Sequence, residues 1–154
     1  MKIFIYNIII LLAIITLFAC SQKKNKKNMD RKIINTENAP KPIGPYNQAI
    51  LANNILFISG QIGINPKTNI LITGDIENET IQVMLNLKAI LNSSNMSFKN
   101  VVKTTIYLKN MDDFSLVNEV YSKYFNKKNA PARETVEVSK LPKDVNVEIS
   151  MIAI

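Results

Sequence analysis

The sequence contains no histidine, and its single cysteine is Cys20. Without histidine the chain cannot build a Ser-His-Asp triad, cannot use imidazole as an acid or base, and lacks the ligand of most zinc sites. A single cysteine excludes a disulfide within the chain, and no cysteine remains for a metal site after residue 20. Any catalysis must therefore use carboxylates, Arg, Lys, Tyr or hydroxyl groups.

Acidic residues are absent from the first part of the chain, where the first is Asp30. Residues 1–28 hold five lysines, and subtracting these five from the net charge of +7 leaves +2 for residues 29–154. The high isoelectric point therefore comes mainly from one local run, which weakens a nucleic-acid function inferred from total charge. The residues after this run are enough for one domain with a single core.

The N-terminal segment is an apolar leader. Lys2 precedes the apolar stretches Ile8–Leu12 and Ile14–Ala19, which are shorter than the roughly 20 apolar residues of a membrane span and favour a secretory signal. Residues 17–20, Leu-Phe-Ala-Cys, resemble a bacterial lipobox, although Phe18 is bulkier than the residue usual there. We therefore expect a leader over residues 1–20, a basic tether over residues 21–29, and lipidation and membrane anchorage through Cys20.

Two alternatives to this lipoprotein interpretation remain open. Met29 stands directly before Asp30, where the domain begins, so translation from Met29 would give a cytoplasmic protein without the leader. The leader could also remain as an uncleaved anchor. In all three cases residues 30–154 form the domain.

The hydrophobic pattern of residues 30–154 predicts an α+β domain. Asp75 is a good N-cap for a helix that ends near residues 92–95, and a second helix is expected over Met111–Phe125, with Phe114, Val117 and Tyr121 in the core. Asn53-Asn54 suits a two-residue hairpin turn, and Gly60–Gly74 reads as a loop. Strands are expected at Arg31–Asn35, Gln48–Ala52, Ile55–Ser59, Val101–Leu108, Thr135–Val138 and Val145–Ile154. This order indicates one mixed sheet with both helices on one face.

Four short segments carry side chains suited to chemistry. They are Pro131-Ala132-Arg133, Val147-Glu148-Ile149, Gly44-Pro45-Tyr46 and Ile58-Ser59-Gly60-Gln61. Each has an ordinary structural explanation when taken alone: a solvated arginine, a carboxylate on the wet face of a strand, a loop anchor and a hydrogen bonder at a strand end. Single residues therefore do not decide the function.

The order of these segments is more specific, because together with residues 86–90, 102–108 and 141–149 it resembles the Rid/YjgF family along essentially all of residues 30–154. The resemblance implies a chorismate-mutase-like fold and a homotrimer with substrate clefts between subunits. It also implies hydrolysis of reactive enamine and imine acids, such as 2-aminoacrylate and 2-iminobutanoate, to 2-keto acids and ammonia. Neither a metal nor an organic cofactor is expected.

The resemblance also implies roles for individual residues. Arg133 would bind the substrate carboxylate, and Glu148 would position or activate the attacking water. Other cleft positions of the family match Tyr46, Ser59, Asn118 and Thr135.

Two residues depart from the pattern of the family. Thr135 stands where many deaminating members have a cysteine, and it keeps a small hydrogen-bonding group. Glu134 follows the arginine where a small or apolar residue is usual, but strand alternation should direct it to the face opposite Arg133.

Two other classes of function remain open. Members of the family are also described as RNA-binding or ribonuclease-like, although the charge of residues 29–154 and the absence of a basic stripe interleaved with aromatics disfavour that function. The second is a non-catalytic member that binds small ligands or acts as a holdase, which Thr135 and the leader favour slightly.

Overall fold

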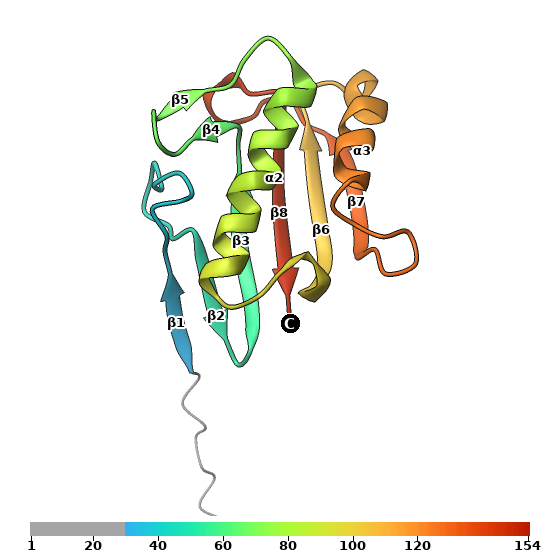
Figure 1. Cartoon of the computed structure of the whole chain (residues 1–154). Coiled ribbons are helices and arrows are strands. Elements are labelled where there is room, and N and C mark those ends of the chain that lie inside the picture. Colours follow the sequence, from blue (N-terminus) through green and yellow to red (C-terminus); the bar gives the residue numbers. More distant parts are fainter. Residues whose placement is uncertain (1–29) are drawn as a thin grey trace, which may run out of the picture.

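The computed structural model describes residues 30–154, so Cys20 and the basic tether lie outside the described residues. The main feature is a six-stranded sheet of order β1-β2-β3-β8-β6-β7 (Figure 1). Its strands are β1 (Arg31–Ile34), β2 (Ala49–Ala52), β3 (Ile55–Gln61), β6 (Val101–Leu108), β7 (Ala132–Glu137) and β8 (Val147–Ala153). All neighbours are antiparallel except β6 and β7, which are parallel. The predicted mixed sheet is confirmed.

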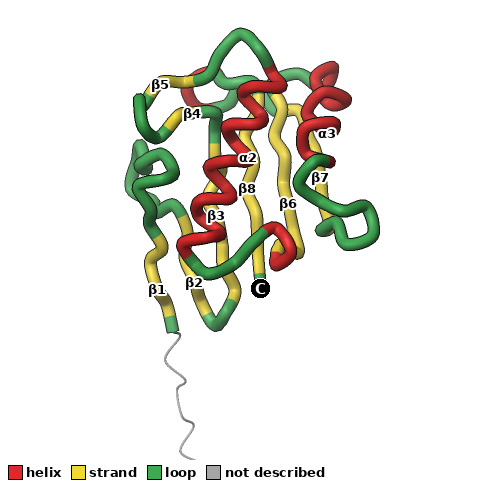
Figure 2. Tube along the Cα trace, in the orientation of Figure 1, coloured by secondary structure: helices red, strands yellow, loops and turns green. Residues whose placement is uncertain are grey.

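Two helices, α2 (Ile76–Ser93) and α3 (Phe114–Ser122), cover one face of this sheet (Figure 2). The Asp75 side chain caps α2 by accepting from the backbone N–H groups of Glu77 and Asn78, as its position predicts. The second helix is shorter than predicted. The helix α3 ends at Ser122 and is preceded by the 3-10 turn η2 (Met111–Asp113). Asn110 caps this turn, because its side chain accepts from the Asp112 N–H.

The predicted hairpin between β2 and β3 is also confirmed. Asn53 has φ 49° and Asn54 has φ 66°. Both central residues of a type I′ turn need positive φ, which asparagine tolerates better than most residues. This turn sets the antiparallel register in which Ala52 faces Ile55.

Two predictions are wrong in part. Residues 60–74 are not all loop, because β3 continues to Gln61 and a small second sheet pairs β4 (Ile64–Asn65) with β5 (Ile70–Leu71). Ile64 packs in a separate apolar cluster, and that burial fixes this hairpin against the domain. Val117 and Tyr121 are buried as predicted, but Phe114 is 39% exposed, because it begins α3 next to the edge strand β7.

The core lies between the sheet and the two helices, and the opposite face of the sheet carries neither of them. We call it the open face. Alternation places Phe57 there, and Phe57 is 45% exposed. Its neighbour across β3 and β8 is Ile152, so Ser150 and Glu148 share this face. Within residues 30–154 no helix has the length and apolar character needed to cross a bilayer.

Candidate functional site

Arg133 lies on the helix-covered face, at the edge strand β7. Its partner in the parallel register is the buried Thr104, whose hydroxyl accepts from the Tyr121 hydroxyl of α3 at 3.1 Å. The Arg133 guanidinium stands 4.8 Å from the centre of the Tyr121 ring and 5.8 Å from that of Phe114. Its Nη1 donates to Asn118 Oδ1 at 2.9 Å. Two aromatic rings and one amide therefore hold the cation at a fixed place between α3 and β7.

The charge of Arg133 is not neutralised within the described part of the chain, where no carboxylate lies within ion-pair distance of it. Glu134 points to the open face, as alternation predicts, where it pairs with Lys103 and accepts from Thr105 Oγ1 at 2.8 Å. The hydrogen bond from Lys103 lowers the pKa of Glu134. Because a guanidinium has five N–H donors, Arg133 keeps donors for the carboxylate of a ligand.

Thr135 follows on the same face of β7, two residues after Arg133. Its Oγ1 is buried and makes no hydrogen bond to any residue of the described range 30–154. A buried hydroxyl without a partner costs about 1–3 kcal/mol. We call Arg133, Asn118 and Thr135 the arginine half-site.

Glu148 lies on the other face of the sheet. It pairs with Tyr107 of β6, whereas Arg133 pairs with Thr104, and residues three apart on one strand point to opposite faces. Partial burial raises the pKa of the Glu148 carboxyl above its ordinary value. The carboxyl rests directly against the backbone of Gly60, where any side chain would overlap it.

A pocket of about 360 Å³ opens beside Glu148. It is lined by Ile43, Tyr46, Ser59, Gly60, Ile62, Pro142 and Glu148. The Tyr46 hydroxyl accepts from the Ile43 N–H at 3.2 Å, and the Ser59 hydroxyl donates to the Asn47 carbonyl at 2.8 Å. These bonds fix both side chains at the pocket wall. We call Tyr46, Ser59 and Glu148 the glutamate half-site.

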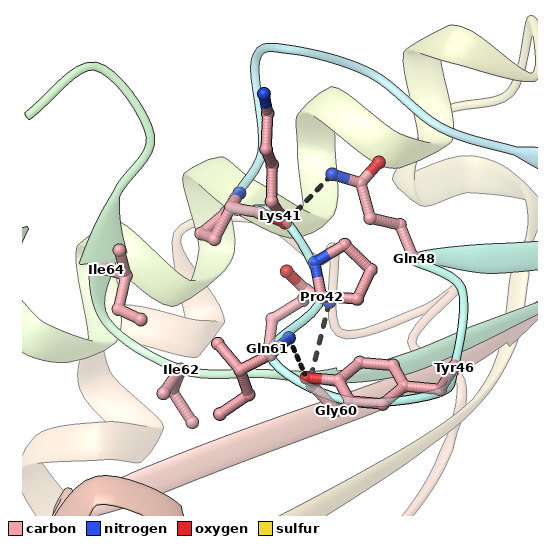
Figure 3. Close-up of a pocket in the computed structure, with 10 residues that line it drawn as sticks. Lys41, Pro42, Tyr46, Gln48, Gly60, Gln61, Ile62 and Ile64 are labelled. Atoms are coloured by element: carbon pink, nitrogen blue, oxygen red, sulfur yellow. Dashed lines mark hydrogen bonds between the residues drawn. The ribbon is translucent and has the colours of Figure 1, made fainter. Parts of the chain in front are cut away.

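The loop of residues 39–46, which contains three prolines, forms one wall of this pocket through Ile43 and Tyr46. Figure 3 shows the Tyr46 ring beside Gly60, with Ile62 and Gln61 nearby. The loop is held from beneath by Gln48, whose amide donates to the carbonyls of Ala39 and Pro40 at 3.1 and 2.9 Å. Figure 3 is centred on a second, smaller cavity, which shares Ile43, Tyr46, Gly60 and Ile62 with the first. Its volume of about 30 Å³ leaves room for no more than about two water molecules.

The structure therefore brings the six predicted residues together as two groups of three. Sequence reasoning missed the aromatic rings beside Arg133 and the apolar pocket walls Ile43, Ile62 and Pro142. Tyr121 and Phe114 were assigned only to the core, because nothing in the local pattern shows that α3 packs over β7. Gly60 carried a usable signal, since a glycine inside a strand often marks a close approach.

Within residues 30–154, no group of three or more Cys, Asp or Glu side chains is placed to bind a metal ion. The two half-sites together offer one cation that can bind an anion, Arg133, and one partly buried carboxylate that can accept a proton, Glu148.

Comparison with known proteins gives a consistent set of relatives. Residues 36–154 match the sequence model of the family described as endoribonuclease L-PSP. A RutC family protein of Pyrococcus horikoshii is 57% identical over 123 residues, which are 80% of this chain and 97% of that protein. The human 2-iminobutanoate/2-iminopropanoate deaminase is 44% identical over 124 residues, 80% of this chain and 90% of that protein.

Solved structures agree with this result. A Yersinia pestis protein of the conserved Rid family is 50% identical and superposes with a TM-score of 0.78, covering 80% of this chain and 98% of that chain. That protein is described as one of unknown function.

Proposed function

Because the chain belongs to the Rid/YjgF family, also described as endoribonuclease L-PSP, we propose that it hydrolyses reactive imine and enamine acids to 2-keto acids and ammonia. Substrates of this class are 2-aminoacrylate and 2-iminobutanoate. One observation carries the proposal: within residues 30–154, the Arg133 guanidinium is held by Asn118 without an ion-pair partner, and Glu148 is a partly buried carboxylate that rests against Gly60.

Arg133 binds the substrate carboxylate in this proposal. A planar guanidinium forms two parallel hydrogen bonds with a carboxylate, and this grip fixes the imine carbon next to it. The rings of Tyr121 and Phe114, together with Asn118, hold the fork in one orientation before the substrate arrives.

In this proposal Glu148 is the general acid–base group that activates the attacking water. Water adds to the C=N carbon, and one of its protons passes through the Glu148 carboxylate to nitrogen, which gives a carbinolamine. Glu148 then takes the remaining hydroxyl proton as the C=O bond forms and passes it to nitrogen as the C–N bond breaks, so that ammonia and the keto acid leave and the carboxylate is restored. The imine is already electrophilic, so acid–base assistance of about 10²–10⁴-fold is sufficient. The raised pKa of Glu148 favours this task, because a carboxylate with a higher pKa is a stronger base.

A single chain cannot apply both groups to one small substrate, because the arginine and glutamate half-sites lie on opposite faces of the sheet. We propose that Arg133 of one copy and Glu148 of the next form each complete site, in a closed ring of three copies. The open face supports this assembly, since it exposes Ile33, Phe57 and Val136, which a neighbouring copy would cover.

The function is tested by a coupled assay. A serine or threonine dehydratase generates the imine, and the release of keto acid is timed with and without the protein. We expect the protein to accelerate release in proportion to its concentration. Unchanged release, at protein concentrations that bind 2-oxobutanoate, would instead support a non-catalytic ligand-binding protein.

Sharing of the site between copies predicts a specific complementation. Arg133→Ala and Glu148→Gln, each strongly impaired alone, are co-expressed with different tags, and trimers carrying both tags are purified. A ring containing both variants has one interface with both wild-type groups, so we expect about one third of wild-type activity. Trimers carrying two tags on the same variant are the control. Activity at the level of the single variants would show that the site is not shared in this way.

The description of the family as an endoribonuclease favours one second candidate, an RNA-cleaving or RNA-binding protein. Residues 29–154 carry a net charge of only +2, and RNA binding through phosphates requires several cations and weakens steeply with salt. Cleavage of single-stranded RNA that is abolished by Arg133→Ala, without keto-acid release, would favour this candidate over the deaminase.

A further inference from the structure

Glu79 is the one charged side chain in the buried core of residues 30–154, with 1% of its surface exposed. It lies in the first turns of α2 and takes no part in the proposed reaction. A buried carboxylate is costly unless hydrogen bonds compensate it. The partners of Glu79 therefore indicate what it does.

All of these partners belong to the segment that enters β8. Glu79 Oε1 accepts from the backbone N–H of Asn146 at 2.9 Å and from that of Val147 at 3.4 Å, and Oε2 accepts from Asn146 Nδ2 at 2.8 Å. The Asn146 carbonyl in turn accepts from the Lys109 N–H at 2.9 Å. Val147 directly precedes Glu148, so these contacts end one residue before the proposed base.

The chain before β8 is neither an α-helix nor a strand. Residues Pro142–Asp144 form the 3-10 turn η3, in which Lys143 and Asp144 have φ 55° and 58°. Non-glycine residues at positive φ are held only when their surroundings over-determine them. Lys109 restrains this turn by an ion pair with Asp144 at 3.0 Å, and Glu79 restrains the chain just after it, at Asn146 and Val147. Glu79 also packs tightly on the connection between β3 and β4, where a Cβ at Gly63 would lie 2.7 Å from Glu79 Cγ.

Asn86, two turns further along α2, holds the opposite wall of the pocket. Its Nδ2 donates to the carbonyls of Ile62 and Ile64 at 3.0 and 2.9 Å. The helix α2 therefore fixes both the segment directly after β3, the strand that carries Ser59 and Gly60, and the start of β8, the strand that carries Glu148. Burial holds these bonds in place, because breaking them would leave polar groups without partners.

We propose that Glu79 is a positioning residue, which sets the place of Glu148 in the pocket through the Asn146 and Val147 N–H groups. The inference rests on the proposed function for the role of Glu148. This role requires a hydrogen-bond acceptor at position 79 on a side chain long enough to contact Asn146. It does not require the negative charge.

Two substitutions separate reach from charge. Glu79→Asp keeps the carboxylate but is one methylene too short to reach Asn146, and we expect kcat to fall about 10–100-fold, as for a misplaced catalytic group. Glu79→Gln keeps the length of the side chain, and its one oxygen still accepts from the two backbone N–H groups. The Asn146 side-chain amide then rotates by half a turn, so that its oxygen faces the new NH₂ group. We expect Glu79→Gln to stay within about threefold of wild type.

The control is Thr80→Val, a substitution at the adjacent buried position. Among residues 30–154, the Thr80 hydroxyl bonds only to the Ile76 carbonyl of its own helix. We expect no change in kcat. The dissociation constant of 2-oxobutanoate should change less than about twofold in Glu79→Asp, because Arg133 supplies the carboxylate grip. If Glu79→Asp fails to fold, Asn146→Ala is measured instead, and a kcat loss with the same unchanged affinity is expected.

A change in the environment of Glu148 can also be measured without an assay of activity, by NMR titration of its ¹³C-labelled carboxyl, which gives its pKa. We expect this pKa to fall toward the ordinary value in Glu79→Asp and to stay raised in Glu79→Gln. If the wild type deaminates nothing, the proposed function fails, while this measurement still decides the positioning role. An unchanged Glu148 pKa and unchanged kcat in Glu79→Asp, or equal losses in Glu79→Asp and Glu79→Gln, would overturn the inference.

Discussion

Glu148→Gln is expected to lower kcat about 10²-fold, the lower end of what acid–base assistance contributes. Glutamine keeps the shape of the side chain against Gly60 but cannot take the proton of the attacking water. The affinity for 2-oxobutanoate should change little, because Arg133 holds the carboxylate. Steady-state rates in the coupled assay and keto-acid titrations measure the two effects. Glu119→Gln, at an exposed position of α3, is the matched control and should leave both unchanged.

The raised pKa of Glu148 also predicts how wild-type kcat and the stability of the protein depend on pH. Glu148 acts as a base only when ionised, so wild-type kcat should fall as the pH drops through its folded-state pKa, which burial raises above 4.5. The ionised form is disfavoured in the fold. Glu148 therefore lowers stability as the pH rises from the unfolded-state pKa through the folded-state pKa. At neutral pH the Gln variant should melt at the same temperature or higher. Full activity in Glu148→Gln would make Glu148 an ordinary surface residue.

The local parts of this fold could be predicted from the sequence. Val101–Leu108 is dense in β-branched residues and forms β6 with those bounds. Asp75 starts α2 and Asn53-Asn54 makes the hairpin turn, because each acts on backbone groups a few residues away. The small β4–β5 sheet was missed, because a two-residue strand has no periodicity to detect and is stabilised by distant contacts.

The site shows the same division between local and distant information. Alternation alone predicted that Arg133 and Glu134 point to opposite faces, and the structure confirms it. The relation between Arg133 and Glu148 depends on the position of β8 beside β6, and on the parallel pairing of β6 with β7. No local pattern encodes either pairing. The division of the six residues into two half-sites was therefore visible only in the structure.

Arg133→Lys is expected to lower kcat/KM at least tenfold, because it removes the fork while keeping one unit of positive charge. Lysine presents a compact charge on a flexible stem, cannot form two parallel hydrogen bonds, and stacks less well between Tyr121 and Phe114. A hydrogen bond to a charged group is worth at least about 1.5 kcal/mol, which corresponds to that factor. Arg31→Lys, at the other arginine of the chain, is the control and should change nothing.

Arg133→Ala should lose more activity than Arg133→Lys, since no cation remains to orient the acid. 2-Oxobutanoate should raise the melting temperature of the wild type but not that of Arg133→Ala, because a ligand stabilises only a fold that binds it. Without ligand, both variants should melt close to the wild type, since Arg133 is partly exposed on an edge strand and makes one hydrogen bond within the described residues. If Arg133→Lys instead unfolds the protein or dissociates its oligomer, the arginine serves an interface between copies. Arg133 would then no longer support carboxylate binding, and the deaminase proposal would lose its main evidence.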